Sequence, residues 1–519
     1  MSRVLITCSG LGNRIGELTK YTNKSLVRIG EKPAISYVIN SYSKDTEFII
    51  TLGYFGDQVR DFLLIAYPDR KFIFVEVDNY EGPGSSLLYS MLCAKNELNC
   101  PFTFHACDTI IEKDFIPEPT SNWLGGYPKQ DSSQYRTLNV ENDIVVKLND
   151  KGEESYDYEY VGLCGIKDYK LFWDIAQDLY NQNKNDTSLS DCDVVKKMLY
   201  TEIFESFILK NWLDIGNMAS LKHARENISD KFEILDKDDE SIFIVDDHVI
   251  KFFYNEEICK NRVLRAEVLK GLVPDIVSSS KNFYKYRYVD GELFSKSVNI
   301  PKFKNFLNWS KEKLWEPVVV SNFKDVCKEF YITKTNKRIN KFLTDNNIND
   351  KEQIINGVKV PSINYLMDKL DVDSLCYGNA VRNHGDFVME NVLLNGGDFT
   401  LIDWRQDFGG IIEYGDVYYD ISKLNHNLTL DHDILHKHLY TININNDGSI
   451  ISDVLRSEKS VHCQRILEEF VISNGWSWNK VEILTAIIWL NMSPLHSKDL
   501  SKFLFYFGKY NLFKALKGI

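Results

Sequence analysis

Several features that define other protein classes are missing from this sequence. Its ten cysteines include no C-x-x-C pair and no cluster with histidine at zinc-site spacing, so we expect neither a disulfide framework nor a structural zinc ion. No run of eighteen apolar residues occurs, and a helix that crosses a bilayer needs about twenty. These absences predict a cytoplasmic protein with reduced thiols and no membrane insertion.

The sequence also lacks an excess of positive charge and a recognisable targeting segment. Its formal net charge is −13, which argues against a nucleic-acid-binding surface but not against nucleotide substrates. The strand-like Val4–Thr7 stands where a signal peptide would have a basic segment and an apolar core, so we expect no secretion. Internal repeats and low-complexity segments are absent as well.

The 519 residues are enough for two or three domains. Up to about residue 225, strand-like runs alternate with helical patterns, which predicts βαβ units and a largely parallel sheet. The expected strands are Val4–Thr7, Phe48–Thr51, Phe72–Val75 and Phe102–His105, and the expected helices are Pro33–Tyr42, Ser85–Asn96 and Ala219–Asn227. We expect this α/β domain, residues 1–227, to end just before the polar Ser229–Lys231.

Residues 228–519 have a different pattern. A predicted hairpin of Ile242–Val245 and His248–Phe253 is followed by a helix through Ala266–Leu269 and a strand at Tyr284–Val289. This is the element order of a kinase small lobe, at about residues 232–292. The remainder, about residues 293–519, is mostly helical in pattern and is expected to form the large lobe.

The segment most informative about chemistry is Asn383–Asn391, followed by the apolar run Phe399–Ile402 and Asp403. Phosphoryl transfer from ATP needs a carboxylate to accept the hydroxyl proton of the substrate and oxygen ligands for the metal ions on the phosphates. Asp386 and Asn391 have the D-x-x-x-x-N spacing, and Asp403 closes a strand-like run. We therefore expect Asp386 to be the catalytic base and Asn391 and Asp403 to be ligands of Mg²⁺.

The form His384–Asp386, with Gly where protein kinases have Arg, resembles the aminoglycoside phosphotransferase and choline kinase superfamily. The resemblance implies a bilobal α+β protein-kinase-like domain that phosphorylates a small molecule with ATP. The D-F-G of Asp407–Gly409 lies in a glycine-rich turn, so Asp403 is the better metal ligand. Asp416 and Asp420 match the superfamily's G-D-x-x-x-D segment and are expected to be structural.

Three further residues are expected to bind ATP. Lys251 follows two apolar strand residues like the lysine of V-A-I-K, and Glu267 is its expected helix partner. Tyr288 begins a segment that resembles the adenine-binding hinge of such kinases. The many aromatic residues would suit a cage for a quaternary ammonium such as choline, but they are spread over the whole chain, so we assign no such cage.

A loop of small residues, Ser9–Asn13, directly follows the first strand and precedes Arg14. Such a loop lets backbone N–H groups approach a phosphate, and an arginine can complete the clamp. The residues expected to bind the nucleotide here are Ser9, Gly10, Leu11, Gly12 and Asn13. A dinucleotide-binding Rossmann unit is an alternative, although the spacing is not G-x-G-x-x-G and no acidic residue ends the second strand.

The positions that follow resemble the sugar-phosphate nucleotidyltransferase family. Leu18-Thr19, Asn23–Leu26 and Lys32-Pro33 keep the order and spacing of that family, with Asn23 where it usually has Pro. The resemblance implies a GT-A-like domain with Lys24 and Arg14 as catalytic cations. It assigns the nucleotide base to Gly82, Gly84 and Ser85, Mg²⁺ to Asp108 and Asp214, and we add Lys147 as a candidate ligand of the substrate phosphate.

The two activities are chemically consecutive, because a kinase makes the phosphate monoester that a nucleotidyltransferase consumes. We therefore expect a bifunctional enzyme that uses ATP, an NTP (CTP favoured) and Mg²⁺ to convert a small alcohol to its phosphate and then to an NDP-activated donor for surface glycans or lipids. One alternative is a hexose 1-phosphate nucleotidyltransferase, using UTP or another NTP, fused to a sugar kinase. Others are a kinase for an unrelated acceptor, such as an antibiotic, and a transferase with a regulatory kinase-like module.

Overall fold

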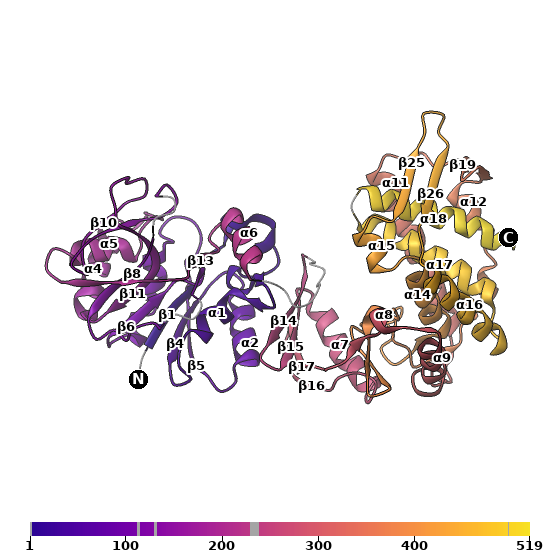
Figure 1. Cartoon of the computed structure of the whole chain (residues 1–519), viewed down its shortest axis with the longest axis horizontal. Helices are drawn as coiled ribbons and strands as arrows, with labels where there is room; N and C mark the ends of the chain where they lie inside the picture. The colour runs from indigo at the N-terminus through magenta and orange to yellow at the C-terminus, as the bar shows by residue number, and fades with distance from the viewer. Residues whose placement is uncertain (1–2, 112–114, 129–131, 229–237, 497, 519) are drawn as a thin grey trace. The chain divides into compact units, whose positions relative to one another are not determined.

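The computed structural model describes residues 3–111, 115–128, 132–228, 238–496 and 498–518 (Figure 1). The expected boundary at Ser229–Lys231 and the start of the expected small lobe lie outside these ranges. Contacts divide the chain into two compact units, Met1–Cys259 with Val277–Tyr288 and Lys260–Ile276 with Val289–Ile519. A functional boundary at residue 227 stays a prediction.

A nine-stranded sheet forms the centre of the first unit. In order across the sheet the strands are β5 (Lys71–Glu76), β4 (Glu47–Leu52), β1 (Arg3–Cys8), β6 (Phe102–His105), β11 (Tyr158–Ile166), β8 (Asn122–Pro128), β12 (Phe204–Ile208), β10 (Ile144–Asn149) and β9 (Thr137–Glu141). The four expected strands are β1, β4, β5 and β6, which pair in parallel. Beyond β6 most pairs are antiparallel, so the sheet is mixed and the expectation of a largely parallel sheet is wrong for that half.

Helices cover both faces of the sheet, because its central strands bury both sets of alternating side chains. Val4 and Ile6 of β1 pack with α1 and α2, whereas Leu5 packs with α3 and α4. The helices are α1 (Ala34–Asn40), α2 (Gly56–Ala66), α3 (Leu87–Cys93), α4 (Tyr169–Gln182), α5 (Asp191–Met198) and α6 (Met218–Asn227), with 3-10 segments η1 (Asn13–Thr19), η2 (Lys24–Leu26) and η3 (Lys95–Glu97). The α/β class expected for this half is confirmed, and α1, α3 and α6 are the three expected helices.

Two short antiparallel ribbons complete this part of the fold. One joins β2 (Arg28–Ile29) to β3 (Lys32–Pro33), and the other joins β7 (Thr109–Ile110) to β13 (Leu213–Asp214). The second ribbon links segments that lie far apart in the sequence. It carries one of the expected metal ligands.

A four-stranded sheet has the order β14 (Glu240–Val245), β15 (His248–Phe253), β17 (Phe283–Arg287) and β16 (Ile276–Ser279). The expected hairpin is β14–β15, which turns at Asp246 with a φ of +54°. Phe243, Ile250 and Phe283 share one core with Phe62 of α2, so these strands belong to the first unit. The helix that follows the hairpin, α7 (Glu256–Val268), begins earlier than expected.

The second unit is mostly helical, as the pattern predicts. Its helices are α8 (Phe294–Ser297), α9 (Ile300–Trp309), α10 (Phe323–Lys328), α11 (Lys334–Asp345), α12 (Ile363–Asp368), α13 (Val372–Cys376), α14 (Val417–Thr429), α15 (His432–His436), α16 (Glu458–Ser473), α17 (Trp478–Met492) and α18 (Lys498–Lys517), with π-helical η4 (Ser310–Leu314) and η5 (Glu329–Thr333) and 3-10 segments η6 (Met389–Asn391) and η7 (Ser493–Leu495). Helices α14, α16 and α18 pack against α17 (Figure 1). In the described part of the chain no helix combines the length and apolarity needed to cross a bilayer.

Three small sheets accompany these helices. Their strands, in order within each sheet, are β18 (Glu292–Leu293), β22 (Val392–Asn395) and β23 (Asp398–Leu401); β20 (Val358–Val360), β19 (Gln353–Ile355), β26 (Ile450–Val454) and β25 (Tyr440–Ile444); and β21 (Ala380–Val381) and β24 (Gly415–Asp416). The segment between β21 and β22 is the expected catalytic loop. Strand β23 ends just before Asp403.

Candidate active sites

The loop that follows β1 is fixed by its neighbours. Ser9 Oγ lies 2.7 Å from Ser90 Oγ of α3, and the Ser9 carbonyl accepts a hydrogen bond of 3.0 Å from the Tyr54 N–H. Gly12 has a φ of +71°, and a Cβ at this position would lie 2.8 Å from Thr19 Cγ2. Glycine is therefore required here for both its backbone conformation and its small size.

Asn23, which stands where the family usually has proline, holds the next segment. Its buried amide donates to the carbonyls of Cys8 at 2.8 Å and Tyr54 at 2.6 Å, and its Oδ1 accepts from the Ser25 N–H at 2.9 Å. It also caps η2, which begins at Lys24. The departure from the family pattern thus leaves Lys24 on a firmly anchored segment.

Lys24 forms an ion pair with Asp108. The Lys24 Nζ lies 2.6 Å from Asp108 Oδ2, and the two side chains are 12% and 22% exposed. Burial works to lower the pKa of Lys24, but the attraction of Asp108 outweighs it and the pKa is raised. Burial works to raise the pKa of Asp108, but Lys24 holds that pKa below its usual range. Both groups are therefore charged at neutral pH.

The β7–β13 ribbon brings Asp214 next to Asp108. The Ile215 N–H donates to the Asp108 carbonyl at 3.1 Å, and the Tyr135 hydroxyl donates to Asp214 Oδ2 at 3.2 Å. Burial, and then repulsion from Asp108, raises the pKa of Asp214. The two expected metal ligands thus converge from distant parts of the sequence.

This pair of carboxylates suits Mg²⁺. The ion usually binds one or two protein carboxylates and completes its octahedral shell with water and substrate phosphates. Among the residues that the structure describes, no group of three or more His, Cys, Asp or Glu side chains is placed to hold a metal ion. The donor set therefore fits an ion that is held jointly by the protein and a triphosphate.

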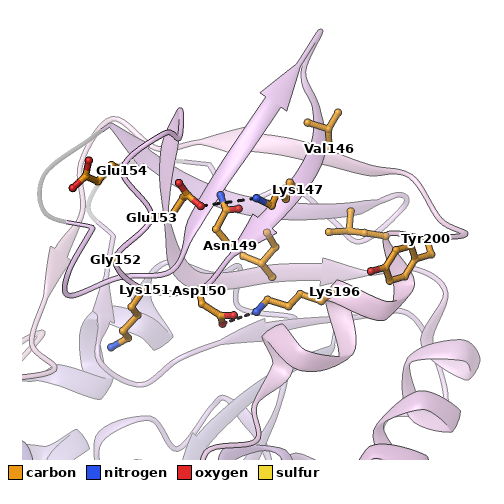
Figure 2. A pocket seen from close by; sticks show the side chains of 12 residues that line it. Val146, Lys147, Asn149, Asp150, Lys151, Gly152, Glu153, Glu154, Lys196 and Tyr200 are labelled. Carbon is orange, nitrogen blue, oxygen red and sulfur yellow. Dashed lines mark hydrogen bonds and ion pairs between the residues drawn. The ribbon is translucent and has the colours of Figure 1, made fainter.

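Lys147 lines a pocket of about 810 Å³ that is formed by β10, the loop after it and α5 (Figure 2). Its Nζ lies 3.9 Å from Glu153 Oε2, and its side chain is 63% exposed. Lys196 pairs with Asp150 in the same pocket. Lys147 and Lys196 are therefore each already paired with a carboxylate of this pocket.

Lys151 lies in the loop after β10, and its charge interacts with that of Asp214. Its side chain points away from Lys147 in Figure 2. Burial and then repulsion from Arg14 lower the pKa of Lys151, while Asp214 opposes this shift. Arg14, which is exposed, also acts on the charges of Lys24 and Asp108. Its charge and that of Lys151 therefore act on this site, whereas the expected phosphate ligand Lys147 is engaged with Glu153.

The expected base-binding loop connects β5 to α3. Gly82 and Gly84 have φ values of +81° and +84°, and a Cβ on Gly84 would lie 2.8 Å from the Lys184 carbonyl. The Ser85 N–H and hydroxyl both donate to the Gly82 carbonyl, at 3.1 and 2.7 Å. The remaining residues expected to bind the nucleotide are at least partly accessible: Gly10, Leu11 and Asn13.

In the second unit, Asp386 and Asn391 share one compact loop. The Asn391 amide donates to the Asp386 carbonyl at 2.9 Å and lies 3.4 Å from Asp386 Oδ2. Lys423 of α14, with its Nζ 2.8 Å from Asp386 Oδ1, was not predicted from the sequence. Burial works to raise the pKa of Asp386, but Lys423 and then His384 hold that pKa well below its usual range.

Asp403 is brought to the same loop by the end of β23. The Ile402 N–H donates to the Asn391 carbonyl at 2.9 Å, and His384 Nε2 lies 3.0 Å from the Ile402 carbonyl. Asp403 itself has a φ of +59°, a conformation that side-chain-bearing residues adopt rarely and often at functional sites. The expected base Asp386 and the expected metal ligands Asn391 and Asp403 therefore lie on adjoining segments.

Asp416 and Asp420 lie beneath this loop, where the sequence predicts supporting residues. The Asp420 carboxylate accepts hydrogen bonds from the N–H groups of His384 at 2.8 Å and Gly385 at 2.7 Å, and from the Trp315 indole at 3.1 Å. Burial raises the pKa of Asp420 to about 6. Asp416 caps the start of α14.

The D-F-G at Asp407–Gly409 forms a tight turn. Phe408 and Ile411 exchange backbone hydrogen bonds of 2.8 and 3.1 Å, and Asp407 Oδ1 accepts from the Gly410 N–H at 3.0 Å. The centroid of the Phe408 ring lies 4.3 Å from the centroid of the Phe330 ring. Asp407 thus serves a turn rather than the end of a strand.

The residues expected to bind ATP have contrasting surroundings. Lys251 on β15 is buried, and the Tyr288 N–H donates to the Asp247 carbonyl at 2.7 Å. The Glu267 side chain on α7 is 74% exposed and lies 3.9 Å from Lys270. These are the surroundings of a solvated helix residue, and the ATP-site role of Glu267 stays a prediction.

Arg265, two positions before Glu267, is the buried charged residue of this helix. Its guanidinium donates to the Ile412 carbonyl at 2.6 Å and to the Asn383 carbonyl at the start of the expected catalytic loop. Burial lowers the pKa of Arg265 to about 10. The sequence signal for this role is its position four residues before the apolar Leu269, a spacing that places two side chains on one face of a helix.

No protein-family profile matches this chain. The bifunctional protein GlmU of Methanococcus aeolicus is 22% identical over 233 residues, which are 43% of this chain and 54% of that protein. The choline-phosphate cytidylyltransferase of Streptococcus pneumoniae is 26% identical over 147 residues, which are 28% of this chain and 62% of that protein. The N-terminal region therefore resembles nucleotidyltransferases, and the chain spans about half the length of the first of these relatives.

A solved structure of the CTP:phosphocholine cytidylyltransferase from Streptococcus pneumoniae gives a TM-score of 0.38 at 18% identity. The superposition covers 44% of this chain and 100% of that chain. A similarity of this size does not bear on activity or substrate. The kinase-like character of the second unit stays a prediction.

Proposed function

We propose that the N-terminal half transfers a nucleotidyl group from an NTP to a phosphate monoester and releases pyrophosphate. The observation that carries this proposal is the convergence of Lys24, Asp108 and Asp214. The sequence similarity of this region to nucleotidyltransferases supports it.

The chemistry needs positioning and charge neutralisation more than proton transfer, because a phosphate monoester is already largely ionised at neutral pH. Asp108 and Asp214 would hold Mg²⁺, which when bound neutralises charge on the triphosphate. Lys24, Arg14 and Lys151 would place positive charge around the phosphates before the reaction begins. Gly12 and the loop around it would let the backbone approach the phosphates.

We further propose that the C-terminal half phosphorylates a small alcohol with ATP. Asp386 would accept the hydroxyl proton, and Asn391 and Asp403 would hold Mg²⁺ on the ATP phosphates. Lys423 keeps Asp386 ionised and therefore able to accept that proton. The grouping of these side chains on adjoining segments supports this assignment.

Together the two reactions would convert X–OH to X–phosphate and then to NDP–X, an activated donor for a surface glycan or lipid. CTP is the favoured nucleotide because one relative is a cytidylyltransferase. The test is pyrophosphate release by the full chain with each NTP and a panel of phosphorylated alcohols. Asp108→Ala, Asp214→Ala and Lys24→Ala should each abolish or strongly reduce this release while ATP-dependent phosphorylation continues.

Asp143→Asn, at an exposed turn position with a φ of +63°, is the matched control and should behave like the wild type. Wild-type pyrophosphate release in all three site variants would refute the assignment. Loss of ATP-dependent phosphorylation in these variants would instead argue against two separate sites.

A further inference from the structure

A small pocket in the second unit adjoins the residues proposed for phosphoryl transfer. It has a volume of about 180 Å³ and is enclosed by η5, α11, α14, α17, η7 and the segment after Asp403. Four of its lining residues are cations: Lys334, Arg338, Arg405 and Lys423. The Lys423 ammonium also pairs with Asp386 at 2.8 Å, so the pocket adjoins the proposed catalytic base.

This concentration of positive charge is costly to the folded protein. Lys334 and Arg338 are four residues apart on α11, a spacing at which like charges on a helix repel. The other walls are largely apolar and include Leu484, Ile487 and Ile488 of α17. None of the described residues that line the pocket is Asp or Glu.

The carboxylates that face these cations do not balance them. Asp386 pairs with Lys423, and Asp407 acts on Lys334 through space. Burial, and then repulsion from Arg405 and Arg338, lowers the pKa of Lys334 to about 6 against that attraction. A bound anion would restore the charge of Lys334 and offset the repulsion.

The aromatic side chains in the pocket do not form a free cage for an organic cation. Lys334 Nζ lies 4.0 Å from the ring centroid of Phe330, and the Arg405 guanidinium lies 5.3 Å from the same centroid. Phe330 is therefore already engaged with two protein cations. A quaternary ammonium placed here would be repelled by Arg338, Arg405 and Lys423.

We propose that this pocket binds an anionic group of the alcohol acceptor, a carboxylate or a phosphate, beside Asp386. The inference rests on the proposed kinase function and names its substrate class. Ligand pockets for drug-sized molecules are usually about 300–1,000 Å³, so the acceptor is small, a few carbon atoms between its anionic group and its reacting hydroxyl. The donor made by the two reactions then carries this anionic group as well.

The first test uses the full chain with ATP and a series of acceptors matched in size: glycerol, glycerate, glycerol 1-phosphate, ethanolamine and choline. ADP formation dependent on the acceptor is measured. We expect kcat/KM to be highest with an anionic acceptor, and the comparison of glycerate with glycerol 1-phosphate separates carboxylate from phosphate. A higher kcat/KM with choline, ethanolamine or glycerol would overturn the inference and leave the kinase proposal standing.

The second test uses variants of the cations that do not contact Asp386. Arg338→Met and Lys334→Met should each raise the KM of the anionic acceptor roughly tenfold to a hundredfold, the range for loss of a charge-assisted hydrogen bond. The KM of ATP should not change. Lys341→Met is the matched control, because Lys341 lies on the same helix, is exposed and pairs with Asp345 at 2.7 Å.

The pH dependence gives a separate readout. Because the anion favours protonated Lys334, the affinity of the wild type for the anionic acceptor should fall as pH rises from about 6 to 9, and Lys334→Met should flatten this change. An increase in the KM of ATP alone would overturn the inference, because the cations would then serve the nucleotide phosphates.

If no acceptor in the series is phosphorylated, the kinase proposal is the part in doubt, and calorimetry with inorganic phosphate and acetate tests the pocket directly. Binding that is lost in Arg338→Met but kept in Lys341→Met would support the anion site. Failure of both anions to bind the wild type would overturn it.

Discussion

Asp386 is the single residue on which the proposed phosphoryl transfer depends most. Because Lys423 and His384 stabilise its ionised form, Asp386→Asn removes the proton acceptor without much change in size. We expect ATP-dependent phosphorylation to fall by about 10²–10⁴-fold, the usual contribution of a general base. Nucleotidyl transfer from a supplied X–phosphate, measured as pyrophosphate release, should stay near the wild-type rate.

Asp407→Asn is the matched control for this variant. Asp407 belongs to the turn that spells D-F-G and caps the Gly410 N–H, so its loss should change phosphorylation only slightly. A drop as large as that of Asp386→Asn would mean that Asp407, and not Asp403, is the metal ligand.

Asp420 makes the stability of the second unit depend on pH. Its pKa in the folded protein is about 6, above the ordinary value of about 3.9 for aspartate. The folded state therefore holds this proton more tightly than the unfolded state. The stability gained from the protonated group is complete below about pH 4 and is lost as pH rises through about 6.

The variant Asp420→Asn cannot titrate and should not show this loss. The difference in free energy of unfolding, Asp420→Asn minus wild type, should therefore rise by about 3 kcal/mol between pH 4 and pH 7.5. Denaturant titrations followed by tryptophan fluorescence at several pH values give this difference, with exposed Asp368→Asn as the control. A difference that is flat with pH would show that Asp420 is ionised throughout.

At the residue scale, the sequence predicts groups that belong to one short segment and misses groups supplied from elsewhere. Asp386 and Asn391 are found by their spacing alone. Lys423 carries no motif, although it is three positions after Asp420 and so shares a face of α14 with it. Lys147 was expected to bind the substrate phosphate, but it lies on β10 and pairs with Glu153. The charge of Lys151, in the loop that follows, interacts with Asp214 instead, and only the folded strand and loop show this difference.

At the scale of elements, the loop from β1 to η2 depends on Asn23. Asn23→Ala would remove donors to two carbonyls and the cap of η2, so we expect a loss of about 1–3 kcal/mol in the free energy of unfolding. Lys24 would then be less firmly placed, and the KM of the phosphorylated substrate should rise. Denaturant titration and pyrophosphate-release kinetics measure the two effects.

Asn23→Pro is an informative companion to this variant. The φ of Asn23 is −67°, which proline adopts without strain and with less entropy lost on folding. It should therefore lose less stability than Asn23→Ala. A greater loss would show that the proline ring or the missing backbone N–H disturbs this buried segment, because both variants lose the same side-chain hydrogen bonds.

Element by element, buried strands are the best predicted part of the fold. Strand β6 has the predicted limits, Phe102–His105, because its two phenylalanines and the β-branched Thr103 favour a strand. The two-residue strands β7 and β13 have no such signal, yet they bring Asp108 and Asp214 together. The antiparallel half of the sheet was missed because strand direction depends on pairing partners far away in the sequence.

At the scale of the whole molecule, the sequence predicts the elements of the hairpin region but not the unit to which they belong. The order hairpin, helix, strand is that of a small lobe. Yet Phe243, Ile250 and Phe283 complete a core with Phe62 of α2. Which surface an apolar strand covers is decided by the fit of side chains, and no local pattern records it.

This packing predicts how fragments of the chain behave. Lys24, Asp108 and Asp214 all precede residue 227, so fragments 1–227 and 1–288 should both release pyrophosphate. Fragment 1–227 loses the cover that the three strands give to α2, and each buried apolar side chain contributes about 1.5–3 kcal/mol. Its unfolding midpoint should therefore lie several degrees below that of fragment 1–288.

Residues 260–276 pack with the second unit and lack their partners in fragment 1–288, so a version with a flexible Gly/Ser linker in their place is the cleaner comparison. In that version Phe243→Ala should lower the midpoint toward that of fragment 1–227, since it removes one ring from the shared core. Calorimetry and pyrophosphate release on the same samples separate stability from activity. Equal midpoints for fragment 1–227 and the linked version would show that the strands do not stabilise the first unit, and the boundary at residue 227 would then divide stability as well as function.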